Sequence, residues 1–205
     1  MPDRLDRRTI QLLLDSLEGA AYMVAADGTI LAVGGRDWDM FARDNGAPEL
    51  GRDIAGRNIS EFIAGAPVLQ VHHELHRQVC SGERPGADYE FRCDTPRALR
   101  HMRMNVSPVS DAGEIIAALY HAVLIESRPR PAMDLFGRNP ADCAGLPVVT
   151  VCSYCNHVSW PVGAAHADST WISADDYYSR GGTSQVFVSH GICESCFEKV
   201  FAATQ

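Results

Sequence analysis

The chain opens with apolar positions near helical spacing and continues with short apolar runs separated by turn residues. Leucine and isoleucine recur on one side of a helix between positions 3 and 18, and Gly19 is placed to end it. Two apolar runs then flank Asp27 and Gly28. Because an Asp-Gly pair supplies the backbone conformation of a tight hairpin turn, these runs predict two adjacent strands.

The middle of the chain predicts helices followed by strands. Glycine-punctuated segments between positions 38 and 65 indicate short connecting helices. A longer helix is predicted over 68–81, with valine and leucine on its inner side and Gly82 after its last residue. Three strands are then predicted over 87–93, 99–106 and 114–126. This order predicts an α+β fold with a five-stranded antiparallel sheet and helices on one face.

The pattern weakens after the last of these strands and then changes character. Proline and glycine interrupt residues 128–147, which predicts a linker. Strands over 148–151 and 185–188, and a helix over 194–202, are predicted beyond it. The expected organisation is an N-terminal helix (1–19), a sheet domain (20–127), the linker (128–147) and a small cysteine module (148–205).

Composition and charge limit the partners and the compartment. The 205 residues carry a net charge of −8, which argues against nucleic-acid binding because phosphate contacts need a basic face. No apolar run approaches the roughly 20 residues of a membrane span, and the charged start is not followed by the apolar run of a secretory leader. We therefore expect a cytoplasmic protein, without a membrane span, whose thiols stay reduced.

Two thiol pairs of identical spacing carry the strongest chemical signal, Cys152 with Cys155 and Cys193 with Cys196. Each short turn lets two sulfurs point at one ion, so together they predict a closed, structural four-thiolate zinc site, with iron as the lesser alternative. The 37 residues between the pairs exceed the roughly 15 to 20 of common zinc patterns. Disulfides, a redox dithiol and unligated thiols stay open as alternatives. The other cysteines, Cys80, Cys93 and Cys143, are unpaired in spacing.

Residues 10–127 resemble a PAS domain, the small sensory module of bacterial signalling proteins. The resemblance rests on residues 26–30 (Ala-Asp-Gly-Thr-Ile), on residues 56–59 (Gly-Arg-Asn-Ile) and on the end of the long helix at residues 80–83 (Cys-Ser-Gly-Glu). It implies a sensing or protein-interaction role for the sheet domain.

The tail resembles a cysteine-rich, zinc-ribbon-like segment found behind PAS and receiver modules in bacterial signalling proteins. The matching stretches are residues 151–155 (Val-Cys-Ser-Tyr-Cys), Trp171, and residues 188–196 (Val-Ser-His-Gly-Ile-Cys-Glu-Ser-Cys). Such proteins often carry histidine-kinase parts, but nothing in this chain matches a phosphoacceptor helix or an ATP-binding lobe. Kinase activity is therefore not implied.

The long predicted helix carries three histidines that differ in direction. On a wheel of about 100° per residue, only His72 points clearly toward the apolar side, His76 lies near its edge and His73 lies outside it. The PAS resemblance implies that a histidine on this helix can bind haem iron through a neutral imidazole. A hydrogen-bonded core histidine is the alternative reading.

Two further residues are candidate ligand contacts. Trp38 can line a cavity between sheet and helices, although such aromatic residues are most often core. Arg92 clusters with Asp94 and Arg97 and either binds an anionic ligand or forms an exposed salt bridge. The sequence contains no glycine-rich phosphate loop, nucleophile elbow or open metal triad, so no enzymatic activity is expected.

Together these patterns predict a non-catalytic signalling protein, in which a PAS-like sensing or interaction domain is coupled to a structural zinc module. The expected partners are a second copy of the chain through the N-terminal helix, a protein of a signalling pathway, and a small molecule in the domain pocket. A haem sensor that uses His72 and a thiol-based redox switch are the competing functions. The functional part rests on analogy of fold.

Overall fold

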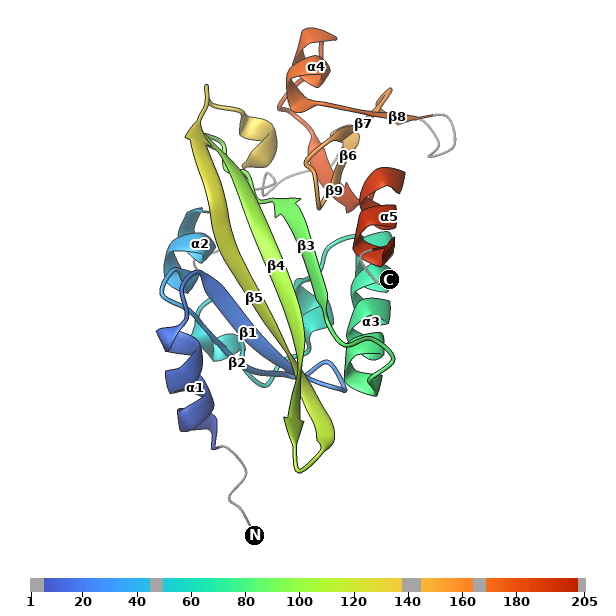
Figure 1. Ribbon diagram of the computed structural model, residues 1–205. Helices are drawn as coiled ribbons and strands as arrows, with labels where there is room; N and C mark the ends of the chain where they lie inside the picture. Colours follow the sequence, from blue (N-terminus) through green and yellow to red (C-terminus); the bar gives the residue numbers. More distant parts are fainter. Residues whose placement is uncertain (1–5, 45–49, 138–144, 164–168, 203–205) are drawn as a thin grey trace.

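The computed structural model describes residues 6–44, 50–137, 145–163 and 169–202 (Figure 1). Its larger sheet is formed by β1 (Ala20–Ala25), β2 (Ile30–Gly34), β3 (Ala87–Arg92), β4 (Ala98–Asp111) and β5 (Glu114–Pro129). All pairings are antiparallel, in the order β2-β1-β5-β4-β3. All five predicted strands are present, and β4 and β5 extend beyond their predicted ends. No helix in the described ranges is long and apolar enough to cross a membrane.

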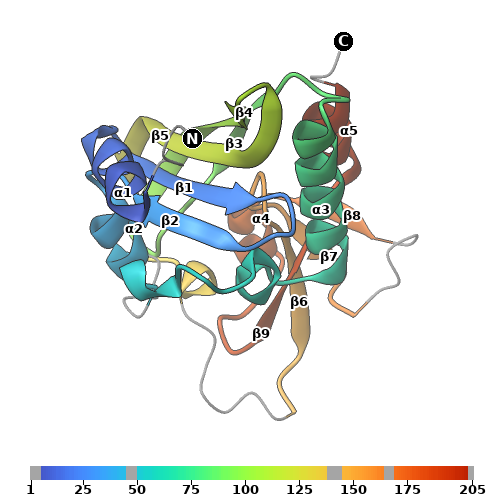
Figure 2. The same ribbon diagram turned by 90° about the horizontal axis from the view of Figure 1, so that it is seen from below.

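The helices between β2 and β3 cover one face of this sheet (Figure 2). They are α2 (Trp38–Asp44), η1 (Arg52–Ile54), η2 (Ile59–Phe62) and α3 (Ala66–Ser81). The helix α3 begins two residues before its predicted start and has a proline in its first turn. Gly82 follows its last residue with φ of 77°, at the predicted end of the helix. The predicted α+β fold class is thereby confirmed.

The N-terminal helix α1 (Arg7–Ser16) packs on the opposite face of the sheet. It begins at Asp6, whose carboxylate accepts a hydrogen bond from the Thr9 backbone N–H at 2.8 Å. Its buried Leu14 contacts a cluster with Ala21 of β1 and Ala32 of β2. Because successive strand residues alternate between faces, β1 contributes to the cores on both sides of the sheet.

A second, four-stranded sheet follows in the order β8-β7-β6-β9. Its elements are β6 (Val148–Cys152), β7 (Val158–Trp160), β8 (Thr170–Ile172) and β9 (Phe187–Gly191), with the helices α4 (Ala174–Ser179) and α5 (Glu194–Ala202). Strands leading into the two cysteine pairs, here β6 and β9, were predicted from the sequence, and so was the closing helix α5. The strand β6 runs parallel to β9 and antiparallel to β7.

The segment predicted as a linker is partly structured. The strand β5 continues to Pro129, and the short helix η3 (Asp134–Phe136) follows. Leu135 of η3 is buried against Val149 and Tyr177 of the C-terminal module. Residues 138–144, which include Cys143, lie outside the described ranges.

One hydrophobic core extends from the larger sheet into the cysteine module. Its buried members include Val71, Leu75, Met104 and Tyr120 from the sheet and α3, and Cys152, Ile192, Cys193, Cys196 and Val200 from the module. The helix α5 packs against β3, and β9 packs against α3. The cysteine module is therefore built onto the larger sheet.

Candidate metal centre

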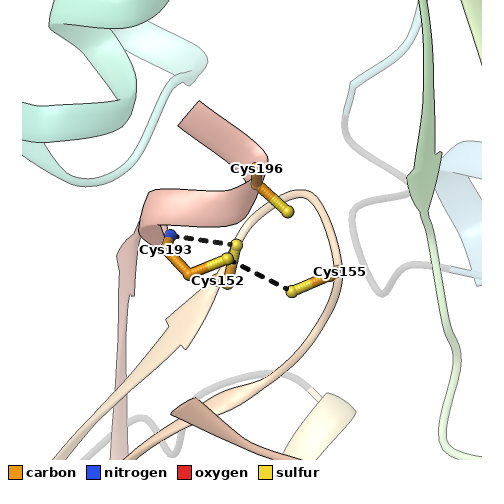
Figure 3. A group of neighbouring side chains, drawn as sticks. All are labelled: Cys152, Cys155, Cys193 and Cys196. Atoms are coloured by element: carbon orange, nitrogen blue, oxygen red, sulfur yellow. Dashed lines mark hydrogen bonds between the residues drawn. The ribbon is translucent and has the colours of Figure 1, made fainter. Parts of the chain in front are cut away.

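The two cysteine turns meet at one end of the smaller sheet (Figure 3). Cys152, the last residue of β6, pairs with Gly191, the last residue of the parallel strand β9. Each strand runs directly into a cysteine turn, so the parallel pairing places both turns at the same end. Cys196 lies in the first turn of α5, which follows directly on Cys193.

The four sulfur atoms form a compact group. All four Sγ atoms, of Cys152, Cys155, Cys193 and Cys196, lie within 4.8 Å of one another. The Sγ atoms of Cys155 and Cys193 are 3.7 Å apart. In a tetrahedral site with zinc–sulfur bonds of about 2.3 Å, neighbouring sulfurs are separated by about 3.75 Å. The spacing and the donor set thus fit a four-coordinate thiolate metal site, and the predicted convergence of the pairs is confirmed.

Hydrogen bonds within the group stabilise a single thiolate. Bonds from the thiols of Cys155 and Cys196 hold the pKa of Cys152 well below its usual range, and the Cys193 backbone N–H donates to its Sγ at 3.4 Å. The same contact with Cys152 raises the pKa of Cys155 to about 12. Without a cation, the negative charge on Cys152 therefore opposes ionisation of the neighbouring thiol. A divalent cation would allow all four thiols to ionise, since it supplies the positive charge that four adjacent thiolates need.

The first cysteine turn is also held by its backbone. The Ser153 N–H donates to Gly191 O at 2.9 Å, and the Asn156 N–H donates to Cys152 O at 2.9 Å. Asn156 has φ of 60°, a left-handed conformation that asparagine tolerates better than most residues. The turn that presents Cys152 and Cys155 is therefore shaped by the fold itself.

The long interval between the pairs contains a structured excursion. It carries β7, β8 and α4, whose buried residues form a separate cluster with β6, including Val151, Val158 and Tyr177. The Tyr177 hydroxyl donates to Thr183 O at 2.8 Å and closes the turn after α4. Such an insertion explains why the 37-residue spacing differs from common zinc patterns without separating the sulfurs.

Tyr154, between the first two cysteines, connects the candidate metal centre to the larger sheet. Its carbonyl accepts a hydrogen bond from the Arg92 backbone N–H at 2.6 Å, at the end of β3. Its ring lies 5.7 Å from that of Tyr89, and burial raises the pKa of its phenol to about 12. The role of Tyr154 was not predicted; its only sequence signal is a large aromatic residue between two predicted ligands.

Two further contacts join the module to the region around α3. The side chain of Arg84 is buried at 2% exposure and its Nη2 donates to Val200 O of α5 at 3.0 Å. Gly65, just before α3, has φ of 88°, and a Cβ added there would lie 2.1 Å from His190 O. The backbone of the module therefore approaches α3 so closely that only glycine fits at position 65.

The burial of the three histidines of α3 differs from the order that the helical wheel predicted. His76 is the most buried of them, at 6% exposure, where its Nδ1 lies 3.0 Å from the Tyr120 hydroxyl and its Nε2 lies 2.9 Å from Ala25 O. The prediction that only His72 points inward is wrong, because the end of β1 covers the edge of the helix that carries His76. His73 is exposed, as predicted.

His72 lies in the core as expected and has an unusual environment. Its ring stacks on Tyr120 with centroids 5.2 Å apart. Both ring nitrogens are buried and neither has a hydrogen-bond partner among the described residues. Burial, together with His76 and His73, lowers the pKa of His72 to about 4, so the imidazole is neutral at pH 7. A neutral imidazole is the form that binds metals.

The remaining candidate ligand residues occupy two different places. Trp38 contacts Tyr22 edge-on at 6.3 Å, and Tyr22 stacks on Tyr120 at 4.8 Å, so an aromatic row links Trp38 to His72. Arg92 instead pairs with Asp94 beside the cysteine module. Tyr22 and Tyr120 face each other across β1 and β5, a pairing that depends on the strand register and was not predicted from the sequence.

Comparisons with known proteins give structural similarity only. Neither a protein-family model nor a curated protein sequence matches this chain. The PAS domain of BvgS from Bordetella pertussis aligns over 59% of this chain and 87% of its own length, with 17% identity and a TM-score of 0.47. A C-terminal domain from Streptococcus mutans aligns over 62% and 90%, with 18% identity and a TM-score of 0.44.

VqmA from Vibrio cholerae is also similar, over 60% of this chain, with 15% identity and a TM-score of 0.41. The chain covers 52% of that VqmA protein, about half of its length. Similarity at this level does not identify a family. The fold class therefore rests on the strand order and the order of elements described above.

Proposed function

We propose that this protein is a non-catalytic signalling protein, in which a PAS-like sensing or interaction domain carries a structural zinc module. The observation that supports this most directly is the shared core. Cys152, Cys193 and Cys196 are buried in the same cluster as Met104 and Tyr120 of the larger sheet. A metal held by the cysteines would therefore stabilise the packing of the sheet domain as well as the module.

Zinc is the proposed metal, with iron as the alternative for the same thiolate set. Cys152, Cys155, Cys193 and Cys196 would hold it, and four thiolates leave no position open for a substrate. Its contribution would be folding free energy, as in other small metal-stabilised modules. Elemental analysis of the purified protein tests this directly, with about one zinc per chain expected. Less than about half a zinc or iron per chain would refute the site.

The coupling between module and sheet can be tested by hydrogen exchange. A Cys196→Ser variant should lose amide protection in β6, β9 and α5, and also in β3, because α5 and the Tyr154 carbonyl pack against that strand. Cys80→Ser is the matched control, since Cys80 lies outside the group of four sulfurs. Unchanged protection of β3 in Cys196→Ser would show that the module does not support the sheet.

A haem sensor remains a second candidate because of His72. The specific observation in its favour is that both ring nitrogens are buried without a hydrogen-bond partner in the part of the chain that the structure describes. Haem bound through His72 would give a Soret band that is lost in His72→Ala. Purified protein that shows no Soret band, even after haem is added, would eliminate this function.

A thiol redox switch is the third candidate. The 3.7 Å separation of the Cys155 and Cys193 sulfurs allows two thiolates to be oxidised to a disulfide by a peroxide with release of the metal. Titration of free thiols alongside zinc analysis distinguishes a redox switch from a purely structural metal site. Reversible loss of thiols together with zinc supports a switch, whereas zinc retained under peroxide supports a purely structural site.

We also infer a homodimer formed through α1. Leu12 and Leu13 on its outer side are 62% and 56% exposed, although the helix already packs on the sheet through Leu14. Covering them with the same helix of a second copy would remove this apolar surface from water. Light scattering should give twice the chain mass for the wild type and the chain mass for Leu12→Gln/Leu13→Gln. A monomeric wild type refutes the dimer.

A further inference from the structure

A cleft of about 630 Å³ lies where the end of β3 faces the cysteine module. Its walls come from the end of η2, the start of α3 and the connection between them, from β3 and the residues after it, from η3, from β6 and the first cysteine turn, and from β9. It does not include His72, Tyr22 or Tyr120, so it is distinct from the interior between the sheet and α3. Both parts of the chain contribute to its surface.

The walls of this cleft are mostly apolar. Its aromatic and aliphatic side chains include Phe62, Val68, Phe91, Leu135, Phe136 and Val188. Ligand sites commonly have volumes of about 300 to 1,000 Å³, lie between domains, and combine apolar walls with a few polar groups. The size, the position and the lining of the cleft match this description.

The polar end of the cleft is formed around one buried carboxylate and two guanidinium groups. The Asp94 side chain, 2% exposed, is contacted by Arg92 Nη2 at 2.7 Å and by Arg130 Nη1 at 3.3 Å. It is also the only acidic side chain among the described lining residues. Two guanidinium groups therefore share one carboxylate, with Asp175 acting on Arg130 from farther away.

Arg92 keeps one nitrogen that Asp94 does not use. Its Nε and Nη2 both donate to Asp94, whereas its Nη1 has no hydrogen-bond partner among the described residues. The side chain is 34% exposed and lines both this cleft and an adjoining hollow, where Glu126 is paired with Arg128. Arg130 is 6% exposed and does not line the cleft, so Arg92 is the cationic group that a ligand would meet.

We propose that this cleft binds a small amphipathic carboxylic acid, with its carboxylate on Arg92 Nη1 and its apolar part along the aromatic wall. A monoanion suits the one guanidinium group that lines the cleft, whereas a phosphate would place a second negative charge next to Asp94. The ligand would contact the sheet domain and the module together, and would stabilise their docked arrangement. The cleft thus supplies a ligand class for the proposed signalling function, but its geometry does not depend on which metal the cysteines hold.

Isothermal titration calorimetry on the full-length protein tests the site with 4-phenylbutyrate and its neutral analogue 4-phenylbutan-1-ol. We expect the acid to bind about tenfold more tightly than the alcohol, as one charge-assisted hydrogen bond provides. Arg92→Gln should bring the two affinities within about threefold of each other. Its fold should persist, because Asp94 keeps its bonds from Arg130 and from the Arg100 backbone N–H.

A second variant tests the position of the site independently of charge. Ala64 is exposed at the surface and lines the cleft, so Ala64→Trp should fill part of it without disturbing the core and weaken both ligands about tenfold or more. Equal affinity of acid and alcohol in the wild type, no measurable binding of the acid, or unchanged binding in Ala64→Trp would each overturn the proposal. Zinc is measured in every sample, so an absent metal with intact acid binding would refute the zinc site alone.

Discussion

Acid should destabilise this protein through His72, and the effect can be calculated. The folded protein holds the imidazole in the core, with a pKa of about 4 against an ordinary value of 6.5. Between these values the unfolded chain binds a proton that the folded chain does not. The contribution of His72 to stability is therefore fully present above pH 6.5 and is lost as the pH falls toward 4.

The shift corresponds to about 2 kcal/mol between pH 7.5 and pH 5, and to about 3 kcal/mol once the pH is below 4. His72→Phe keeps an aromatic ring against Tyr120 and removes the titrating group. The free energy of unfolding of His72→Phe, measured relative to that of the wild type, should therefore rise by about 2 kcal/mol from pH 7.5 to pH 5. In urea melts this equals an added difference of about 1 M in the midpoint.

The comparison between variants separates His72 from the cysteines. The wild type and its variants keep the same four thiols and His76, so release of a metal by acid affects their stability alike. His73→Phe is the matched control, because His73 is exposed on the same helix. Its midpoint should fall with pH nearly in parallel with that of the wild type, because burial, the largest cause of the lowered pKa of His72, is kept in this variant. The reasoning about His72 is refuted if wild type and His72→Phe lose stability in parallel as the pH falls.

Three further substitutions test the packing. Gly65→Ala should lower the free energy of unfolding by about 2 kcal/mol or more in a thermal melt, because it adds a Cβ 2.1 Å from His190 O at a φ of 88°. Gly56→Ala is the control, since Gly56 has a φ of 95° but open space around it, and it should cost about 1 kcal/mol in the same melt. Equal losses of stability in the two variants would show that the close approach of His190 O to position 65 contributes nothing. Tyr120→Phe leaves His76 Nδ1 without its hydroxyl partner and should cost about 1 to 3 kcal/mol, checked by urea unfolding, whereas no change would mean that this hydrogen bond contributes little.

Local patterns in the sequence were sufficient for most of the elements. The period of the apolar positions predicted α1, α3 and all five strands of the larger sheet, since helix and strand faces repeat within a few residues. Turn chemistry at Gly28 and Gly82 marked element ends, because their backbone conformations favour glycine. The spacing of Cys152 and Cys155 predicted one half of the sulfur group for the same local reason.

Contacts between distant residues were decided only by the tertiary structure. The parallel pairing of β6 with β9 joins the two cysteine turns across 37 residues, and no local pattern encodes that register. The burial of His76 depends on the end of β1, and the role of Tyr154 depends on the position of β3. The cleft at Arg92 likewise exists only because segments far apart in the chain pack side by side. Sequence periodicity shows which side of an element is apolar, whereas the partner that covers it is settled by packing of the whole chain.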